Sequence, residues 1–103
     1  MAKFMLAYHG GGMPEGEEAQ AAAMAAWGAY MTKYADTFVG ESNPVGMSKT
    51  VTPEGVADNG GSNPISGFAF VEAADINAAC AIAAECPVLT DGGTVEVAPV
   101  VEM

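Results

Sequence analysis

Two short stretches decide the fold: Ala-Lys-Phe-Met-Leu-Ala-Tyr at residues 2–8 and Gly-Phe-Ala-Phe-Val-Glu at residues 67–72. Successive side chains of a β-strand point to opposite faces, so consecutive apolar residues make both faces apolar. In the first stretch Phe4 and Met5 fall on opposite faces, and Phe68 and Ala69 do so in the second. Strands of this kind need cover on both sides, so both stretches are predicted to be central strands of a sheet.

A first helix is predicted from Glu15 to Tyr34. The glycines at 10–12 end the strand, and the acidic residues that follow suit a helix N-terminus, where the macrodipole attracts negative charge. Large side chains of the helix recur at spacings of three, four and three, which places them on one stripe: Met24, Trp27, Met31 and Tyr34. This stripe is the predicted packing face.

A second helix is predicted after the second central strand. Asp75 is its predicted N-cap, and Pro87 ends it just after Cys86. Cys80 and Cys86 then lie on one helix with their Cα atoms about 9 Å apart, which is beyond the reach of a disulfide bond. Both cysteines are therefore predicted to be reduced and buried. A Cys/His metal site is not expected in a chain that contains one histidine.

Two weaker strands complete the pattern. Met47–Thr52 carries a serine, a lysine and two threonines, and is predicted to be a solvated edge strand. Thr94–Glu102 contains Pro99, which cannot donate a hydrogen bond to a neighbouring strand, and is predicted to be the other edge. Residues 53–66, rich in Gly, Asn and Pro, are predicted to form a long loop that is either mobile or functional.

The resulting order is β-α-β-β-α-β, the ferredoxin-like plan, in which the first and third strands are central. Two helices cover only one face of a four-stranded sheet, so the apolar residues on the other face need a different cover. The simplest cover is the same sheet of a second copy. The sequence therefore predicts a single α+β domain spanning residues 1–103 that works as a homodimer.

The charge of the chain limits its partners. Thirteen acidic residues against three basic ones give a formal net charge of −10, which repels nucleic acid phosphates and anionic lipid head groups. No run approaches the roughly 20 apolar residues of a membrane-spanning helix, and the N-terminal apolar stretch is too short for a secretory signal. Neither nucleic acid nor a membrane is predicted as a partner, and the predicted location is the cytoplasm.

Motifs along nearly the whole chain resemble one family. They are Lys-Phe-Met-Leu-Ala-Tyr at 3–8, Met-Ala-Ala-Trp at 24–27, Lys-Thr-Val at 49–51, Gly-Phe-Ala-Phe-Val-Glu-Ala at 67–73 and Cys-Pro at 86–87. With these motifs the chain resembles the YCII-related proteins, most closely the branch called DGPF-domain proteins. The resemblance implies a dimeric α+β barrel, in which two sheets face each other.

Two features depart from that family pattern. Better-studied YCII proteins carry a His-Asp pair with the histidine in the first helix, whereas the predicted helix from Glu15 to Tyr34 contains no histidine. The Asp-Gly-Pro-Phe motif is also absent, and the corresponding region reads Glu-Gly-Val-Ala-Asp-Asn-Gly-Gly at 54–61. No catalytic role is therefore carried over from the resemblance.

His9 is the main candidate for chemistry, because histidine is the side chain that ordinarily titrates near neutral pH. It stands at a predicted strand end, before glycines that would let a ligand approach the backbone. It is either a pocket acid/base or a residue that merely caps a turn. The residues predicted to bind a small molecule are Met5, His9, Trp27, Ser48 and Asp58.

Three function classes remain open. The sequence shows no phosphate-loop, Ser-His-Asp or paired-carboxylate pattern, and neither a cofactor nor a metal is predicted. The first class is a homodimer that binds a small molecule in a cleft beside the sheet. The second is a small enzyme, a lyase or hydrolase of an aromatic or carbonyl compound, with His9 as acid/base. The third is a protein-interaction or regulatory module that uses the acidic surface and residues 53–66.

Overall fold

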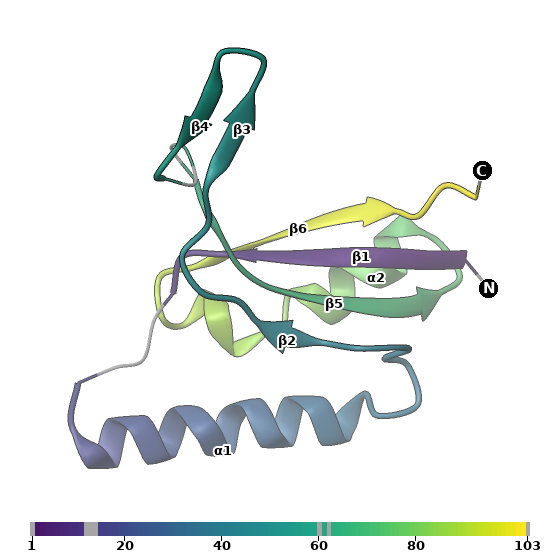
Figure 1. Ribbon diagram of the computed structural model, residues 1–103. Coiled ribbons are helices and arrows are strands. Elements are labelled where there is room, and N and C mark those ends of the chain that lie inside the picture. Colours follow the sequence, from purple (N-terminus) through teal and green to yellow (C-terminus); the bar gives the residue numbers. More distant parts are fainter. Residues whose placement is uncertain (1, 12–14, 60, 62, 103) are drawn as a thin grey trace.

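The computed structural model describes residues 2–11, 15–59, 61 and 63–102 (Figure 1). Its elements follow in chain order: β1 Ala2–His9, α1 Glu17–Lys33, β2 Asn43–Pro44, β3 Thr50–Thr52, β4 Gly55–Ala57, β5 Ile65–Ala73, α2 Ile76–Ala83, a 3-10 turn Pro87–Leu89, and β6 Thr94–Pro99. No helix in this described part of the chain has the length and apolar character needed to cross a membrane.

Four strands form one antiparallel sheet in the order β2-β5-β1-β6. β1 pairs with β5 along its whole length, with Ala2 opposite Ala73 and Tyr8 opposite Gly67. On its other side β1 pairs with β6, from Phe4 opposite Pro99 onward. The two stretches that are apolar on both faces are therefore the central strands, as predicted, and the ferredoxin-like α+β fold is confirmed.

The prediction for the edge strand next to β5 is wrong. Its place is taken by Asn43–Pro44 and by Phe38, which forms an isolated bridge to Val71. The main-chain N–H of Val39 also donates to the carbonyl of Phe70. The chain thus reaches the sheet soon after α1 and leaves it before residues 47–52.

Residues 50–52 instead form a separate hairpin with residues 55–57, which lie in the region predicted to be a long loop. The cause is local. Pro53 and Glu54 make a two-residue turn, and the N–H of Glu54 donates to the hydroxyl of Thr52. Gly55 follows with a φ of 138°, a conformation that other residues rarely adopt. A two-residue turn of this kind brings the two short segments together as a hairpin.

The core lies between the helices and one face of the sheet, with Leu6 and Val71 fully buried at its centre. Three residues of the predicted stripe pack on this core while partly buried: Trp27 and Met31 on α1, and Tyr34 at its C-cap. Met24 does not, since 67% of its surface is exposed, and the buried residue of α1 is Tyr30.

The second helix is shorter than predicted. Asp75 caps it as expected, because its carboxylate accepts a hydrogen bond from the N–H of Ala78 at 2.8 Å. The helix ends at Ala83, so Cys86 lies beyond it rather than within it. Both cysteines are free thiols, but only Cys86 is buried and Cys80 is exposed, which corrects the prediction that both are buried.

Candidate functional site

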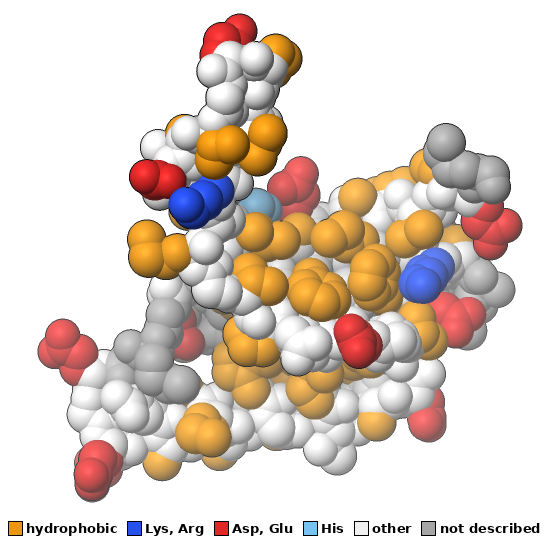
Figure 2. Space-filling view, viewed as in Figure 1, with side chains coloured by type: hydrophobic (Ala, Val, Ile, Leu, Met, Phe, Trp, Pro, Cys, Tyr) orange, Lys and Arg blue, Asp and Glu red, His pale blue; other side chains and the backbone are white. Residues whose placement is uncertain are grey.

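The described helices cover one face of the sheet, and the other face, here called the open face, is largely apolar. Its apolar residues are Met5, Ala7, Phe68, Phe70 and Ala98. Met5 stands opposite Phe70 and Ala7 opposite Phe68, and the two phenylalanine rings meet edge to face at 6.1 Å. Figure 2 shows hydrophobic side chains gathered over the strands on this face. An apolar surface of this kind is typical of an interface or a ligand site.

His9 ends β1 on the open face. The pairing of β1 with β5 slips between Tyr8 and His9, and a bulge of this kind changes the direction of a side chain. Nδ1 of His9 lies 3.0 Å from the carbonyl oxygen of Asn63 and 3.3 Å from that of Pro64. Carbonyl oxygens only accept hydrogen bonds, so these contacts require a hydrogen on Nδ1. In the neutral ring, Nε2 is then the nitrogen that can take up a proton.

Nε2 of His9 faces Glu96, which the sequence analysis missed. The distance from Nε2 to Oε1 of Glu96 is 3.1 Å, and the exposed fractions of the two side chains are 12% and 72%. Glu96 lies on β6 opposite Ala7, so it belongs to the open face. The alternation of Val95 and Val97 with Glu96 indicates the face on which Glu96 lies. The two valines pack on the core, so Glu96 between them points to the opposite face of the sheet.

Close backbone packing holds His9 in place. A Cβ atom added to Gly93 would lie 2.7 Å from the carbonyl oxygen of His9 and 2.6 Å from a methyl carbon of Val88. Glycine is therefore the residue that fits at this position. Gly10 and Gly11 continue the turn with φ values of 68° and 70°, in the left-handed region that glycine favours. Glycines on both sides thus let the end of β1 and the start of β6 approach each other closely.

The structure brings some of the predicted ligand-binding residues together and separates others. Met5 shares the open face with His9. Trp27 lies on the helix side of the sheet, where its ring meets Tyr8 edge to face at 5.6 Å. Asp58 follows β4 and is 88% exposed, and its carboxylate forms an ion pair with Lys49 at 3.1 Å.

Ser48, the remaining predicted residue, precedes β3 and is only partly exposed. Its hydroxyl is buried and has no hydrogen-bond partner among the described residues. Among all the residues that the structure describes, no group of three or more potential metal ligands occurs.

The groups with displaced pKa values lie on the helix side. Burial raises the pKa of the phenols of Tyr8 and Tyr30 and of the Cys86 thiol. The Glu85 carboxylate accepts hydrogen bonds from Lys33 and Tyr34, and the bond from Lys33 is the main cause that lowers its pKa. This cluster joins the end of α1 to the segment after α2. It is surface-exposed and serves to connect the two segments.

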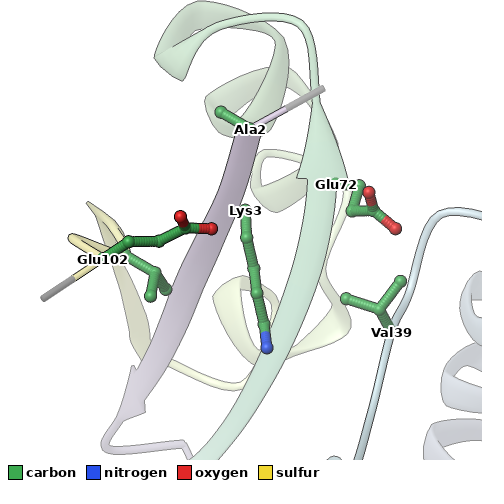
Figure 3. Close-up of a pocket in the computed structure, with 6 residues that line it drawn as sticks. Ala2, Lys3, Val39, Glu72 and Glu102 are labelled. Carbon is green, nitrogen blue, oxygen red and sulfur yellow. The ribbon is translucent and has the colours of Figure 1, made fainter.

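Two hollows of the surface lie away from His9. One of about 540 Å³ lies toward the other end of the sheet (Figure 3), and its lining residues are Ala2, Lys3, Val39, Glu72, Val100 and Glu102. The ammonium group of Lys3 lies 4.8 Å from the ring centre of Phe70. Another, of about 320 Å³, lies beside α1 and the 3-10 turn. His9 lines neither of these two hollows.

The family can now be assigned, because the model of the YCII-related domain matches residues 2–103. The chain belongs to the YCII-related family. No curated protein matches the chain in sequence. Among solved structures, the chain is similar to 5-chloro-2-hydroxyhydroquinone dehydrochlorinase from Burkholderia phenoliruptrix, in complex with 2,5-dihydroxybenzoquinone. The TM-score is 0.59 at 17% sequence identity, over 97% of this chain and 95% of the other, which supports the fold of the YCII-related chain.

Proposed function

We propose that this YCII-related protein is a homodimer that binds a small, flat, largely apolar molecule between the open faces of its two copies. The observation that carries the proposal is the open face itself. Met5, Phe68 and Phe70 are only partly buried, although they lie at the middle of the two central strands. Transferring such surface out of water is worth about 25 cal/mol per Å², so a second copy gains free energy by covering it.

The distribution of polar groups supports a site at this face. Polar or charged side chains lie near its two ends, with Lys3 and Glu72 at one end and His9 and Glu96 at the other. Small-molecule sites are mostly apolar, with a few polar groups that orient the ligand. A cleft between two such faces has this composition, with aromatic walls and hydrogen-bonding groups at its ends.

The oligomeric state tests the first part of the proposal. We expect sedimentation or light scattering to give twice the chain mass of 10.4 kDa. Phe70→Asp places a charge in the middle of the open face and should give single chains. Ala81→Asp, on an exposed position of α2, is the control and should remain a dimer. A wild-type protein with the mass of one chain at micromolar concentration would contradict the dimer.

Ligand binding tests the second part. A suitable probe is 2,5-dihydroxybenzoquinone, the molecule in the complex of the similar dehydrochlorinase. We expect calorimetry to detect binding by wild type and by Ala81→Asp, and none by Phe70→Asp. Equal binding by all three would place the ligand away from the open face, and no binding by wild type would contradict a quinone-like ligand.

A second candidate function, proton transfer by His9, is favoured by the contacts of its ring. The carbonyls of Asn63 and Pro64 hold Nδ1, which leaves Nε2 beside the exposed carboxylate of Glu96. When that carboxylate turns away, Nε2 can accept a proton from a bound ligand while a leaving group departs. Such a reaction belongs to the lyase class.

Chloride release from 5-chloro-2-hydroxyhydroquinone is the assay for this candidate. We expect wild type to release chloride, and His9→Gln to bind 2,5-dihydroxybenzoquinone without releasing chloride, because an amide forms hydrogen bonds but does not exchange protons near neutral pH. Release by His9→Gln at the wild-type rate would remove His9 from the chemistry. Binding of the quinone without any release by wild type would favour a protein that only binds.

A further inference from the structure

The hairpin of β3 and β4, here called the arm, has no support from the rest of its own chain. Its strands form a two-stranded sheet separate from the main one. Among the described helices and strands, none packs substantially on it. Figure 1 shows the arm rising away from the sheet, near the end at which β1 ends. A two-stranded hairpin alone is marginally stable in water, so this arm lacks a packing surface.

One face of the arm is apolar. Val51 stands directly opposite Val56 in the hairpin, and residues in such a pair share a face. Their exposed fractions are 75% and 62%, and that of Met47, just before the arm, is 97%. Glu54, in the turn, is the one charged residue between positions 50 and 57. The arm therefore presents exposed aliphatic side chains with very little charge.

The arm and the open face lie on the same side of the molecule. In Figure 2 the hydrophobic side chains of the arm and those over the strands are visible in one view. The molecule is also flat, with extents of 43 × 43 × 20 Å. A second flat molecule placed over the open face would thus lie next to the apolar side of the arm.

We propose that the arm docks on a second copy of this chain, with Val51 and Val56 forming part of the wall of the cleft between the two open faces. This inference rests on the proposed homodimer and extends it. Each chain carries both an apolar arm and an apolar open face. A two-fold axis places the arm of each copy against the other, so both arms are covered at once.

Charge favours a second copy over a protein of different composition. Two copies with a formal charge of −10 each repel one another least where carboxylates are fewest. Residues 50–57 and the middle of the open face are such surfaces, whereas Glu15, Glu17 and Glu18 gather at the start of α1. A basic partner would be attracted to those glutamates rather than to the arm.

Charge substitutions on the two faces of the arm test this inference. Val56→Asp places a carboxylate on the apolar face, and Ala57→Asp places the same group on the neighbouring residue, which is exposed on the other face. We expect sedimentation equilibrium to show the dimer dissociation constant raised at least tenfold by Val56→Asp and less than threefold by Ala57→Asp. Equal effects of the two substitutions would overturn the docking. Circular dichroism verifies that both variants are folded.

Cross-linking tests the same contact without adding a charge. A benzophenone amino acid at position 51 should, on irradiation, produce a covalent dimer whose cross-linked peptides map to β1 or β5 of the other chain. Cross-links confined to one chain would overturn the inference. A wild-type monomer would remove both the homodimer and the arm contact. A wild-type dimer that Phe70→Asp dissociates and Val56→Asp leaves intact would remove the arm contact alone.

Discussion

His9 and Glu96 are 87 positions apart in the sequence, yet Nε2 of His9 lies 3.1 Å from Oε1 of Glu96. The antiparallel register of β1 and β6 creates this contact, because it places Glu96 opposite Ala7 and one step along the open face from His9. The imidazole is almost enclosed while the carboxylate is mostly exposed. The two partners therefore contribute unequally to stability.

We expect His9→Ala to lower the free energy of unfolding more than Glu96→Ala does. The first change removes an enclosed side chain together with its hydrogen bonds to the exposed carbonyls of Asn63 and Pro64, and the net loss of such a bond costs about 0.5–1.5 kcal/mol. The second removes a carboxylate that is 72% exposed, and a contact made by such a surface carboxylate is worth about 0–1 kcal/mol. Urea unfolding of both variants measures the difference, and equal losses would show that the ring is held by Glu96 alone.

A second pair of substitutions concerns the stripe of α1. Trp27 is partly buried and packs edge to face on Tyr8 and Tyr30. We expect Trp27→Ala to cost about 2–3 kcal/mol, below the range for complete burial, and Met24→Ala to change stability by less than about 0.5 kcal/mol. Urea unfolding monitored by far-ultraviolet circular dichroism compares them, since Trp27 is the one tryptophan and its loss removes the fluorescence signal. A cost of Met24→Ala as large as that of Trp27→Ala would contradict the placement of α1.

The central strands were predictable because burial on both faces leaves a direct trace in sequence. β1 and β5 carry apolar residues at consecutive positions, and both lie in the middle of the sheet. The cap of α2 was predictable for a similar reason, since Asp75 acts on a main-chain N–H three residues away. Features that depend on strand alternation or on neighbours close in sequence can be inferred from one chain.

Two segments could form the edge of the sheet beside β5, and the one that does not pair there is free to form the arm. The alternation of apolar and polar residues does not reveal which segment pairs with β5. Residues 43–44 and 50–52 are both short and largely exposed, so sequence alone does not determine which of them pairs with β5. The contact between His9 and Glu96 depends on the register between strands at opposite ends of the chain. Alternation indicates the face of each residue, but the partner across the sheet follows only from the fold.

The two cysteines should differ in reactivity. Cys80 is exposed on α2, whereas Cys86 is 2% exposed and burial raises the pKa of its thiol, which disfavours the reactive thiolate. We expect a disulfide reagent to modify one thiol per chain quickly in the native protein and the second only on unfolding. In Cys80→Ser the rapid phase should disappear. A rapid phase that persists in this variant would show that Cys86 is accessible.

Alkaline pH should unfold the protein through Tyr8 and Tyr30. Burial raises the pKa of both phenols above the ordinary value of 10.0, so the folded state keeps protons that the unfolded state releases. Their contribution is thus fully present below about pH 10 and is lost as the pH rises further. We expect phenolate absorbance at 295 nm from these two residues to rise together with the loss of circular dichroism. Complete ionisation of all tyrosines before any unfolding would contradict their burial.

The last prediction concerns two glycines whose substitution should have opposite effects. At Gly93 a Cβ atom would meet the carbonyl oxygen of His9 at 2.7 Å and the main-chain nitrogen of Gly11 at 2.9 Å, and neither backbone atom can move without shifting the end of β1. At Gly28, inside α1, no atom lies within 4 Å of the added carbon. Gly28→Ala should therefore stabilise the protein by about 0.5–1 kcal/mol, because alanine loses less backbone entropy in a helix.

We expect Gly93→Ala to destabilise the fold by about 1–3 kcal/mol, the range for a substitution that overpacks a tightly fitted region. The clash also displaces His9, so the variant should change the imidazole resonances in NMR spectra more than Gly28→Ala does. Thermal unfolding of the two variants measures the opposite signs. If Gly93→Ala melted at the wild-type temperature with unchanged imidazole resonances, the close approach of the turn before β6 to the end of β1 would be wrong. The geometry that places Glu96 beside His9 would then be in error as well, since the same turn sets where β6 begins.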